Sequence, residues 1–193
     1  MDNVIVKKTT YEVMEQLNEY TYVIKDNDKE YLLYDFNDSV LNFKNFRFAY
    51  KRLKNVGVSV PKLIAYDKKT RRFVLERLVG DTVFDLLREK ELDEKIYEQA
   101  FLLNYKARIN RMRLDFSPEN FVFSNGTLYY TAFTFTEYVR EEDFSQKELR
   151  QWFYTKDFTE LLISKGLPID KSRIKNEFEQ NKEMVLLVVK FFR

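Results

Sequence analysis

The amino-acid sequence predicts an α+β fold, in which a β-rich first part with one helix precedes a mainly helical second part. Two segments rich in Tyr, Val, Ile and Leu, 20–25 and 30–36, flank the turn-forming cluster Asp26-Asn27-Asp28 and predict a β-hairpin. Apolar residues recur at helical intervals over 39–55. A second hairpin signal, Ser124-Asn125-Gly126, stands among helical patterns. Hairpins mixed with helices in this order are typical of an α+β domain.

The predicted helix over 39–55 has a start signal and a stop signal. Ser39 can cap its first turn, and Gly57 lies just past its end, where helices often terminate. An extended run follows over 58–66, because Pro61 cannot occupy a helix interior.

The middle of the chain predicts a strand, a hinge and two helices. The strand covers 73–78 and leads into Val79-Gly80, which is the natural hinge between two parts of the chain. The helices are expected over 83–88 and 93–109.

Short strands at 121–123 and 128–132 are expected to form the second hairpin. Beyond Glu137 the pattern predicts helix to the end of the sequence, broken near Gly166, with a final helix over 171–192.

The composition favours a folded, water-soluble protein. Hydrophobic residues make up 45% and charged residues 33% of the 193 residues, and the net charge is +2 from 33 basic and 31 acidic residues. A nucleic-acid or membrane-surface protein usually carries a strongly basic balance, so neither partner is expected. The absence of Cys favours an intracellular site, and the absence of His leaves carboxylates, Lys and Tyr for acid–base work. No segment has the apolar length of a signal peptide or a membrane span, so a cytoplasmic location is expected.

Three stretches resemble the protein-kinase-like fold. LKNVGVSVPKLIAY at 53–66 is similar to a helix-to-strand connection of that fold, and VLERLVGDTVFDLL at 74–87 is similar to its hinge. RLDFSPENFV at 113–122 matches the pattern H-G-D-L-x-P-x-N-V-L of the catalytic loop. The likeness is to the small prokaryotic branch near aminoglycoside phosphotransferases, RIO-type kinases and atypical serine/threonine kinases. It implies a reduced β-rich N-lobe over 1–78 and a mainly helical C-lobe over 79–193.

The resemblance assigns site residues in the loop and at the hinge. It places Asp115 at the position of the catalytic base and Asn120, five residues on, at the position of a Mg²⁺ ligand. Both residues are also common turn residues, so a purely structural role in the loop remains open. At the hinge, backbone groups of Glu76 and Leu78 are where an adenine would bind.

Several positions depart from the kinase pattern. Tyr34 stands where the phosphate-binding Lys belongs, and no Glu occurs near 46–48, where its ion-pair partner belongs. Ala132 stands where the metal-binding Asp belongs, with Glu137 as the nearest downstream carboxylate. No Gly precedes Gly57, so a phosphate-cradling glycine loop is absent from the sequence. Four lysines could replace the missing cation, although each is simpler as a surface charge: Lys25, Lys29, Lys44 and Lys51.

A cationic cluster and an apolar tail could each serve either to bind a partner or only to support the fold. A cationic cluster could face an acidic ligand or form a solvated face: Lys106, Arg108, Arg111 and Arg113. The tail over 181–192 is apolar on nearly every side, which predicts a buried helix, or a helix that docks a partner or a second copy of the chain. Trp152 is expected in the core.

Together these features predict a pseudokinase, a kinase-fold scaffold or regulator with weak or no phosphotransfer and an unidentified protein partner. Two alternatives stay open. One is an active atypical kinase for proteins or small molecules, an ATP-dependent phosphotransferase with Asp115 as base. The other is a structural protein that binds no nucleotide. ATP is the cofactor that the resemblance implies, whereas Mg²⁺ would lack its usual aspartate at Ala132.

Overall fold

The computed structural model describes residues 3–192, which divide into two compact units. The first unit contains the described residues up to Arg52 together with Val60–Val79, and the second contains Leu53–Ser59 together with the described residues from Gly80 onward. Among the described residues, no helix combines the length and the apolar character needed to cross a bilayer.

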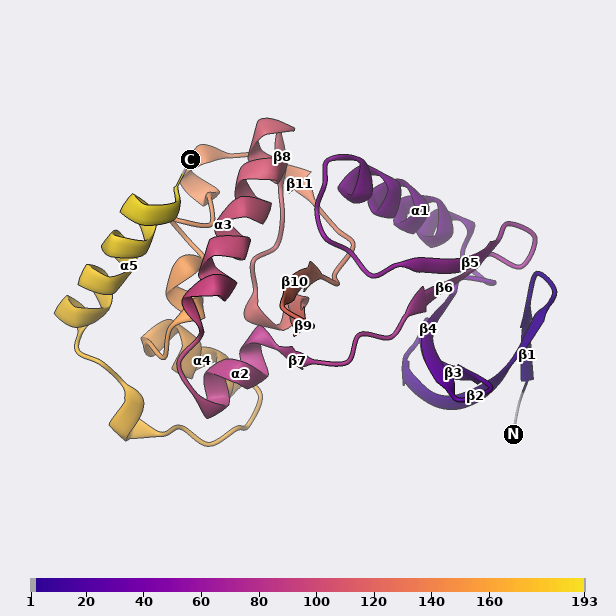
Figure 1. Ribbon diagram of the computed structural model, residues 1–193, viewed down its shortest axis with the longest axis horizontal. Helices are drawn as coiled ribbons and strands as arrows, with labels where there is room; N and C mark the ends of the chain where they lie inside the picture. The colour runs from indigo at the N-terminus through magenta and orange to yellow at the C-terminus, as the bar shows by residue number, and fades with distance from the viewer. Residues whose placement is uncertain (1–2, 193) are drawn as a thin grey trace. The chain divides into compact units, whose positions relative to one another are not determined.

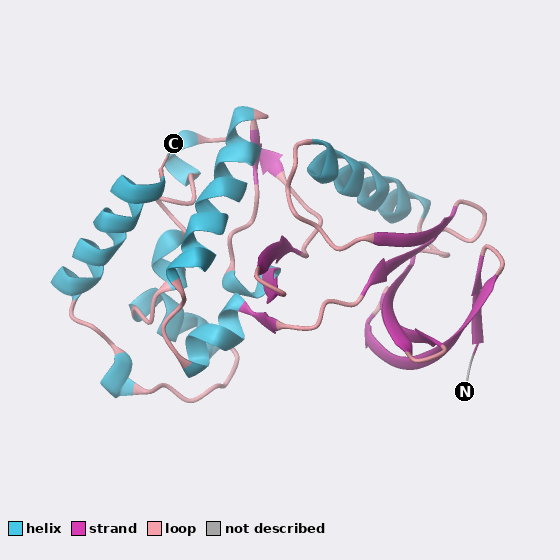
Figure 2. Cartoon of the chain, in the orientation of Figure 1, coloured by secondary structure: helices cyan, strands magenta, loops and turns pink. Residues whose placement is uncertain are grey.

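The first unit is built on a curled six-stranded antiparallel sheet (Figures 1 and 2). Its strands run in the order β1-β2-β3-β4-β6-β5. Their bounds are β1 Asn3–Val6, β2 Thr9–Asn18, β3 Thr21–Asp26, β4 Lys29–Asp35, β5 Leu63–Asp67 and β6 Arg72–Glu76. The hairpin predicted on either side of residues 26–28 is β3 and β4, paired from Thr21 opposite Tyr34 to Asp26 opposite Lys29.

The predicted helix is α1 (Val40–Asn55). The N–H of Asn42 donates to the Ser39 hydroxyl over 3.2 Å, which satisfies one of the free donors of the first turn. Gly57 has a φ of +80°, the left-handed conformation that commonly ends a helix. The inner face of α1 packs on the sheet through Phe43, in a buried aromatic cluster with Phe36 and Phe73.

Strands β1 and β2 were not expected from the sequence. Val4 and Val6 are buried with Tyr11 in the core of the sheet, whereas Ile5 between them is exposed. The C-terminal half of β2 is exposed and mixes polar residues with Met14 and Leu17, and its register with β3 shifts twice. Strand β2 therefore lacks the regular alternation of apolar and polar residues from which a strand is predicted.

The second unit combines four α-helices with short strands and 3₁₀ turns. The helices are α2 Val83–Glu89, α3 Glu94–Ile109, α4 Lys156–Ser164 and α5 Glu177–Phe191. The strands are β7 Asp81–Thr82, β8 Met112–Arg113, β9 Phe121–Ser124, β10 Thr127–Tyr130 and β11 Thr136–Glu137. Strands β10, β9 and β7 form one sheet, and β11 pairs with β8. Gly80 is required where β7 approaches β9, because a Cβ there would lie 2.2 Å from the carbonyl oxygen of Phe123.

Three boundaries in this unit differ from the sequence prediction. Strand β10 ends at Tyr130, because the N–H of Thr131 donates out of the hairpin to the Asn120 carbonyl over 2.9 Å. The chain after Glu137 forms 3₁₀ turns rather than α-helix until α4, because backbone N–H groups bond to Asp143 instead of extending a helix. Helix α5 begins later than expected, at the point where the Asn176 side chain accepts from the N–H of Glu179.

The core of the second unit is aromatic. Trp152 is fully buried, as expected, and its neighbours include Phe116, Phe121 and Phe144, with ring centroids 6.2, 5.2 and 5.3 Å away. The tail helix, predicted to be buried, is α5, and only one face of it packs inward: Gln180 is buried, the Phe191 ring centroid lies 6.1 Å from that of Phe101 on α3, and the other face is exposed.

Candidate functional site

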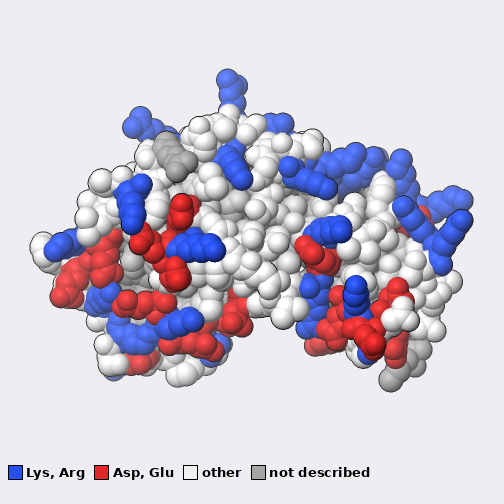
Figure 3. Space-filling model, in the orientation of Figure 1, with Lys and Arg blue, Asp and Glu red and all other residues white. Residues whose placement is uncertain are grey.

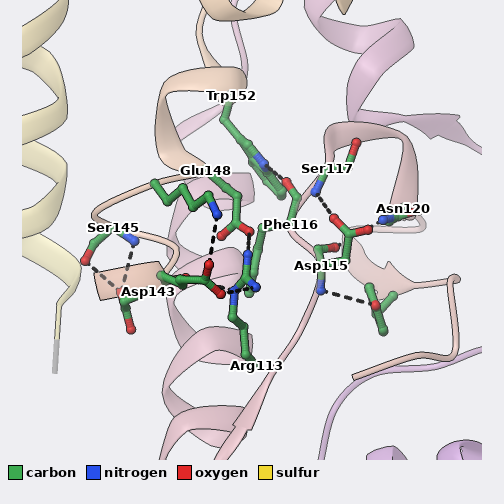
Figure 4. A network of polar contacts seen from close by, with 12 residues as sticks. Arg113, Asp115, Phe116, Ser117, Asn120, Asp143, Ser145, Glu148 and Trp152 are labelled. Carbon is green, nitrogen blue, oxygen red and sulfur yellow. Dashed lines mark hydrogen bonds and ion pairs between the residues drawn. The ribbon is translucent and has the colours of Figure 1, made fainter. Parts of the chain in front are cut away.

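The candidate site is the loop between β8 and β9, which packs against buried aromatic residues (Figure 4). Phe116 is buried, and its ring stacks on Phe144 at 4.4 Å between centroids. The indole N–H of Trp152 donates to the Phe116 carbonyl over 2.7 Å. These contacts fix the backbone of the loop, while the neighbouring Asp115 remains exposed.

Asp115 and Asn120, predicted as a pair, lie together in this loop. The N–H of Ser117 donates to Asp115 Oδ1 over 3.0 Å, and Asn120 Nδ2 donates to the Asp115 carbonyl over 3.2 Å. The Asn120 N–H donates to the Ser117 carbonyl over 2.9 Å. The amide of Asn120 therefore presents its Oδ1 as the atom that could bind a metal, and Asp115 retains its second carboxylate oxygen for a substrate hydroxyl.

Residues just after β10 close the other side of the loop. The N–H and the hydroxyl of Thr131 both donate to the Asn120 carbonyl, over 2.9 and 3.1 Å. This contact places the next residue, Ala132, beside the Asn120 end of the loop. Phe133 follows with a φ of +53°, which is uncommon for a bulky residue and stores local strain.

Tyr130 joins these two segments, a role that no sequence pattern indicated. Its hydroxyl donates to the Thr134 carbonyl over 2.9 Å and lies 3.4 Å from the Asp115 N–H, at the long limit for accepting a hydrogen bond. Burial raises the pKa of the Tyr130 hydroxyl, so it stays protonated at neutral pH. The Tyr130 hydroxyl thus ties the Asp115 loop to the segment that contains Ala132.

Arg113, at the position of the kinase His, is held by two carboxylates. Its Nη1 lies 2.6 Å from Glu142 Oε2, its Nε donates to the Glu142 carbonyl over 2.9 Å, and its Nη2 pairs with the buried Glu148. Burial raises the pKa of Glu148, against the opposing effect of the Arg113 charge. Arg113 therefore stabilises the interior of the second unit.

The other members of the predicted cationic cluster point to different contacts. Lys106 Nζ donates to the Gly57 carbonyl over 2.8 Å, and the guanidinium of Arg108 lies 4.4 Å from the ring centroid of Phe192. The structure does not bring this cluster together as one anion-binding surface.

Tyr34 and Phe46 are in contact within the first unit. Their ring centroids are 4.7 Å apart, and Tyr34 lies on the central strand β4, opposite Thr21 on β3 and Phe73 on β6. Burial raises the pKa of the Tyr34 hydroxyl to about 12. An aromatic pair therefore occupies the position that the resemblance assigns to the Lys and one of the positions, 46–48, near which it places the helix partner.

The hinge residue Glu76 has a structural contact of its own. Its Oε1 accepts from the Lys62 N–H over 2.7 Å, and its own N–H donates to the Lys62 carbonyl over 2.9 Å. The Glu76 N–H therefore already donates a hydrogen bond within the first unit. Leu78, the other hinge residue predicted to face an adenine, is half-buried. Glu137, the alternative carboxylate, is exposed on β11 opposite Met112.

A second residue of this segment, Phe133, fits the kinase pattern beside Ala132. Residues 131–135 read T-A-F-T-F, so Ala132-Phe133-Thr134 has the aromatic residue of the kinase triplet D-F-G in register after β10. The buried Phe133 strengthens the assignment of Ala132, because the match then rests on two neighbouring residues.

Comparisons with known proteins identify the fold. No family model matches the chain, and no curated protein matches it. Among solved structures, the autoinhibited serine kinase domain of the giant muscle protein titin matches with a TM-score of 0.53 and 15% sequence identity. The match covers 67% of this chain and 46% of that chain, so this chain spans about half the length of the neighbour. The chain therefore has a protein-kinase-like fold.

Proposed function

We propose that this chain is a pseudokinase, a kinase-fold scaffold or regulator that does not carry out metal-dependent phosphotransfer. The observation that carries the proposal is the position of Ala132. Ala132 is the second residue after β10. It follows Thr131, which bonds to the Asn120 carbonyl, and precedes the buried Phe133. In active kinases an Asp at this place holds the Mg²⁺ that bridges the phosphates. A methyl group cannot ligate Mg²⁺, which requires oxygen ligands.

The contact between Tyr34 and Phe46 supports the same conclusion from the other unit. A kinase uses a Lys paired with a helix Glu to hold the nucleotide phosphates. Here the two positions form an aromatic pair at 4.7 Å. Loss of both charges together avoids one buried, unpaired charge, which would be costly. The residues of this chain therefore do not fit a metal-bound nucleotide, and a role that depends on its surface is favoured.

A second candidate function is an active atypical kinase with Asp115 as base. The specific observation in its favour is the intact loop. Asp115 is exposed there, and its backbone carbonyl accepts a hydrogen bond from the Asn120 side-chain amide. Electrostatic stabilisation of the transferring phosphoryl group is the main contribution of a kinase. The missing metal-binding carboxylate at Ala132 should therefore reduce catalysis more than the intact loop can support it.

The finer family placement is part of the proposal. The stretches at 53–66, 74–87 and 113–122 favour the small prokaryotic branch of kinase-like proteins. In this interpretation the two compact units correspond to a reduced N-lobe and a helical C-lobe.

Helix α5 offers a surface for a partner or a second copy of the chain. Phe178, Val185 and Val189 lie on one side of the helix and are 79%, 60% and 78% exposed, opposite the side that contains the buried Gln180. Bulky apolar groups at this spacing are typical of a helix that docks in a complex. The first turn is acidic and the last is basic, which favours antiparallel pairing of two copies.

The test of the proposed function is a calorimetric titration of ATP and ADP, with and without Mg²⁺, together with an assay of ATP hydrolysis. Wild type is compared with Asp115→Asn and with the matched surface variant Glu98→Gln, whose carboxylate is also exposed. We expect no Mg²⁺-dependent binding or turnover, and identical behaviour of the three proteins. Mg²⁺-dependent turnover that Asp115→Asn abolishes and Glu98→Gln retains would show that the chain is an active kinase.

A further inference from the structure

The nearly balanced net charge conceals a strongly basic segment. Residues 39–66 contain six Lys and Arg and no Asp or Glu. Because the whole chain carries +2, the remaining residues together carry −4 (2 minus 6). Helix α1 itself holds five of the six cations. Clustering of one sign of charge along a helix is the feature that marks an anion-binding surface.

The two faces of α1 differ in chemistry. The inner face packs Phe43 and Tyr50 into the first unit, where both are buried. The outer face carries Leu41 and Phe48, seven residues apart on one side of the helix, and they are 68% and 64% exposed. The inner contacts anchor the helix to the sheet.

Cations surround Phe48 on this outer face. Lys44 lies one turn before it, and Lys51 and Arg52 lie one turn after it, at helical neighbour spacing. Among the described residues, no carboxylate forms an ion pair with Lys44 or Lys51. Figure 3 shows the Lys and Arg side chains in a row over α1, while Asp and Glu of the same unit gather over β2, β3 and β4.

We propose that the outer face of α1, defined by Leu41, Lys44, Phe48, Lys51 and Arg52, binds an anionic phospholipid surface. The cations attract acidic headgroups, and the two apolar side chains enter the boundary between headgroups and acyl chains. A convex helix surface suits a deformable bilayer. Contacts with the phosphates of a nucleic-acid duplex would use the cations alone and give no role to Phe48 and Leu41.

The expected size of the effect follows from the charges. A Lys or Arg near an anionic bilayer changes binding about fivefold, so removing Lys44 and Lys51 together weakens binding about 30-fold. Binding also falls steeply as salt rises, because these charges are exposed and are screened within about 10 Å.

The experiment is flotation of the full chain with vesicles of neutral phosphatidylcholine and with vesicles that also contain phosphatidylserine. The test variants are Lys44→Gln/Lys51→Gln and Phe48→Ser. The matched control is Lys171→Gln/Lys182→Gln, which removes two exposed cations from the second unit. Thermal melts confirm that each protein is folded. We expect salt-sensitive binding to the anionic vesicles only, about 30-fold weaker in the α1 lysine pair, weaker in Phe48→Ser, and unchanged in the control.

Four results would overturn the proposal. They are no binding to the anionic vesicles, equal binding to neutral vesicles, equal loss in the control pair, and duplex DNA or RNA that displaces the protein from the vesicles at physiological salt. Because the assay uses no nucleotide, its outcome is independent of whether the chain is a pseudokinase.

Discussion

Replacement of Arg113 by Met tests how the candidate loop is held in place. The change keeps much of the side-chain volume but removes the cation that pairs with Glu142 and Glu148. The Glu148 side chain is only 9% exposed, and its Oε2 has no hydrogen-bond partner among the described residues. Removing one partner of a buried ion pair costs roughly 3–5 kcal/mol, whereas the more exposed Glu142 pair adds at most about 1 kcal/mol. We expect a loss of about 3 kcal/mol in the free energy of unfolding at neutral pH.

The loss should depend on pH in a defined direction. Burial raises the folded-state pKa of Glu148 above its unfolded value, and removing Arg113 raises it further. A carboxyl with a raised folded-state pKa binds more protons folded than unfolded, so its contribution to stability falls as pH rises from the unfolded pKa through the folded one. The free energy of unfolding of the variant should therefore approach that of wild type below about pH 4.5. The difference between the two should be largest at neutral pH.

Urea unfolding of wild type, Arg113→Met, Glu148→Gln and the double variant measures this effect across pH. The double variant should recover part of the loss at neutral pH, because it contains no buried unpaired carboxylate. A loss of stability that is the same at acidic and neutral pH, and that Glu148→Gln does not reduce, would refute the reasoning. The cost would then come from packing of the Arg113 side chain and not from its charge.

Three further predictions concern the site and the surface. Tyr130→Phe removes a buried hydroxyl that donates to a backbone carbonyl over 2.9 Å, so chemical denaturation should show a loss of about 1–2 kcal/mol, and no loss would contradict a bridging role. Ala132→Asp should create Mn²⁺ binding, detectable by paramagnetic line broadening, if this position matches the kinase metal site; an unchanged spectrum would argue against that match. Val189→Glu should shift a self-associated chain toward monomer in sedimentation velocity, whereas the control Lys171→Gln, at an exposed residue outside α5, should not, and a wild type that is monomeric at all concentrations would exclude pairing through α5.

Much of the secondary structure could be predicted because its signals are local. The turn at 26–28, Ser39 and Gly57 each act on residues a few positions away, so the hairpin and α1 were correctly predicted. The loop with Asp115 and Asn120 was predicted for the same reason, because its pattern lies within one short stretch. Strand β2 was missed because its exposed half has no alternating pattern.

The sequence by itself determined the β3–β4 hairpin, helix α1 and the loop with Asp115 and Asn120, since each depends on residues that are close in the chain. Only the tertiary structure decided that Tyr34 contacts Phe46, that Arg113 is held by Glu148, and that the outer side of α1, with its row of Lys and Arg, stays exposed. These facts depend on which distant segments pack together. Burial of apolar surface across the whole unit decides that packing, and no short stretch of sequence contains it.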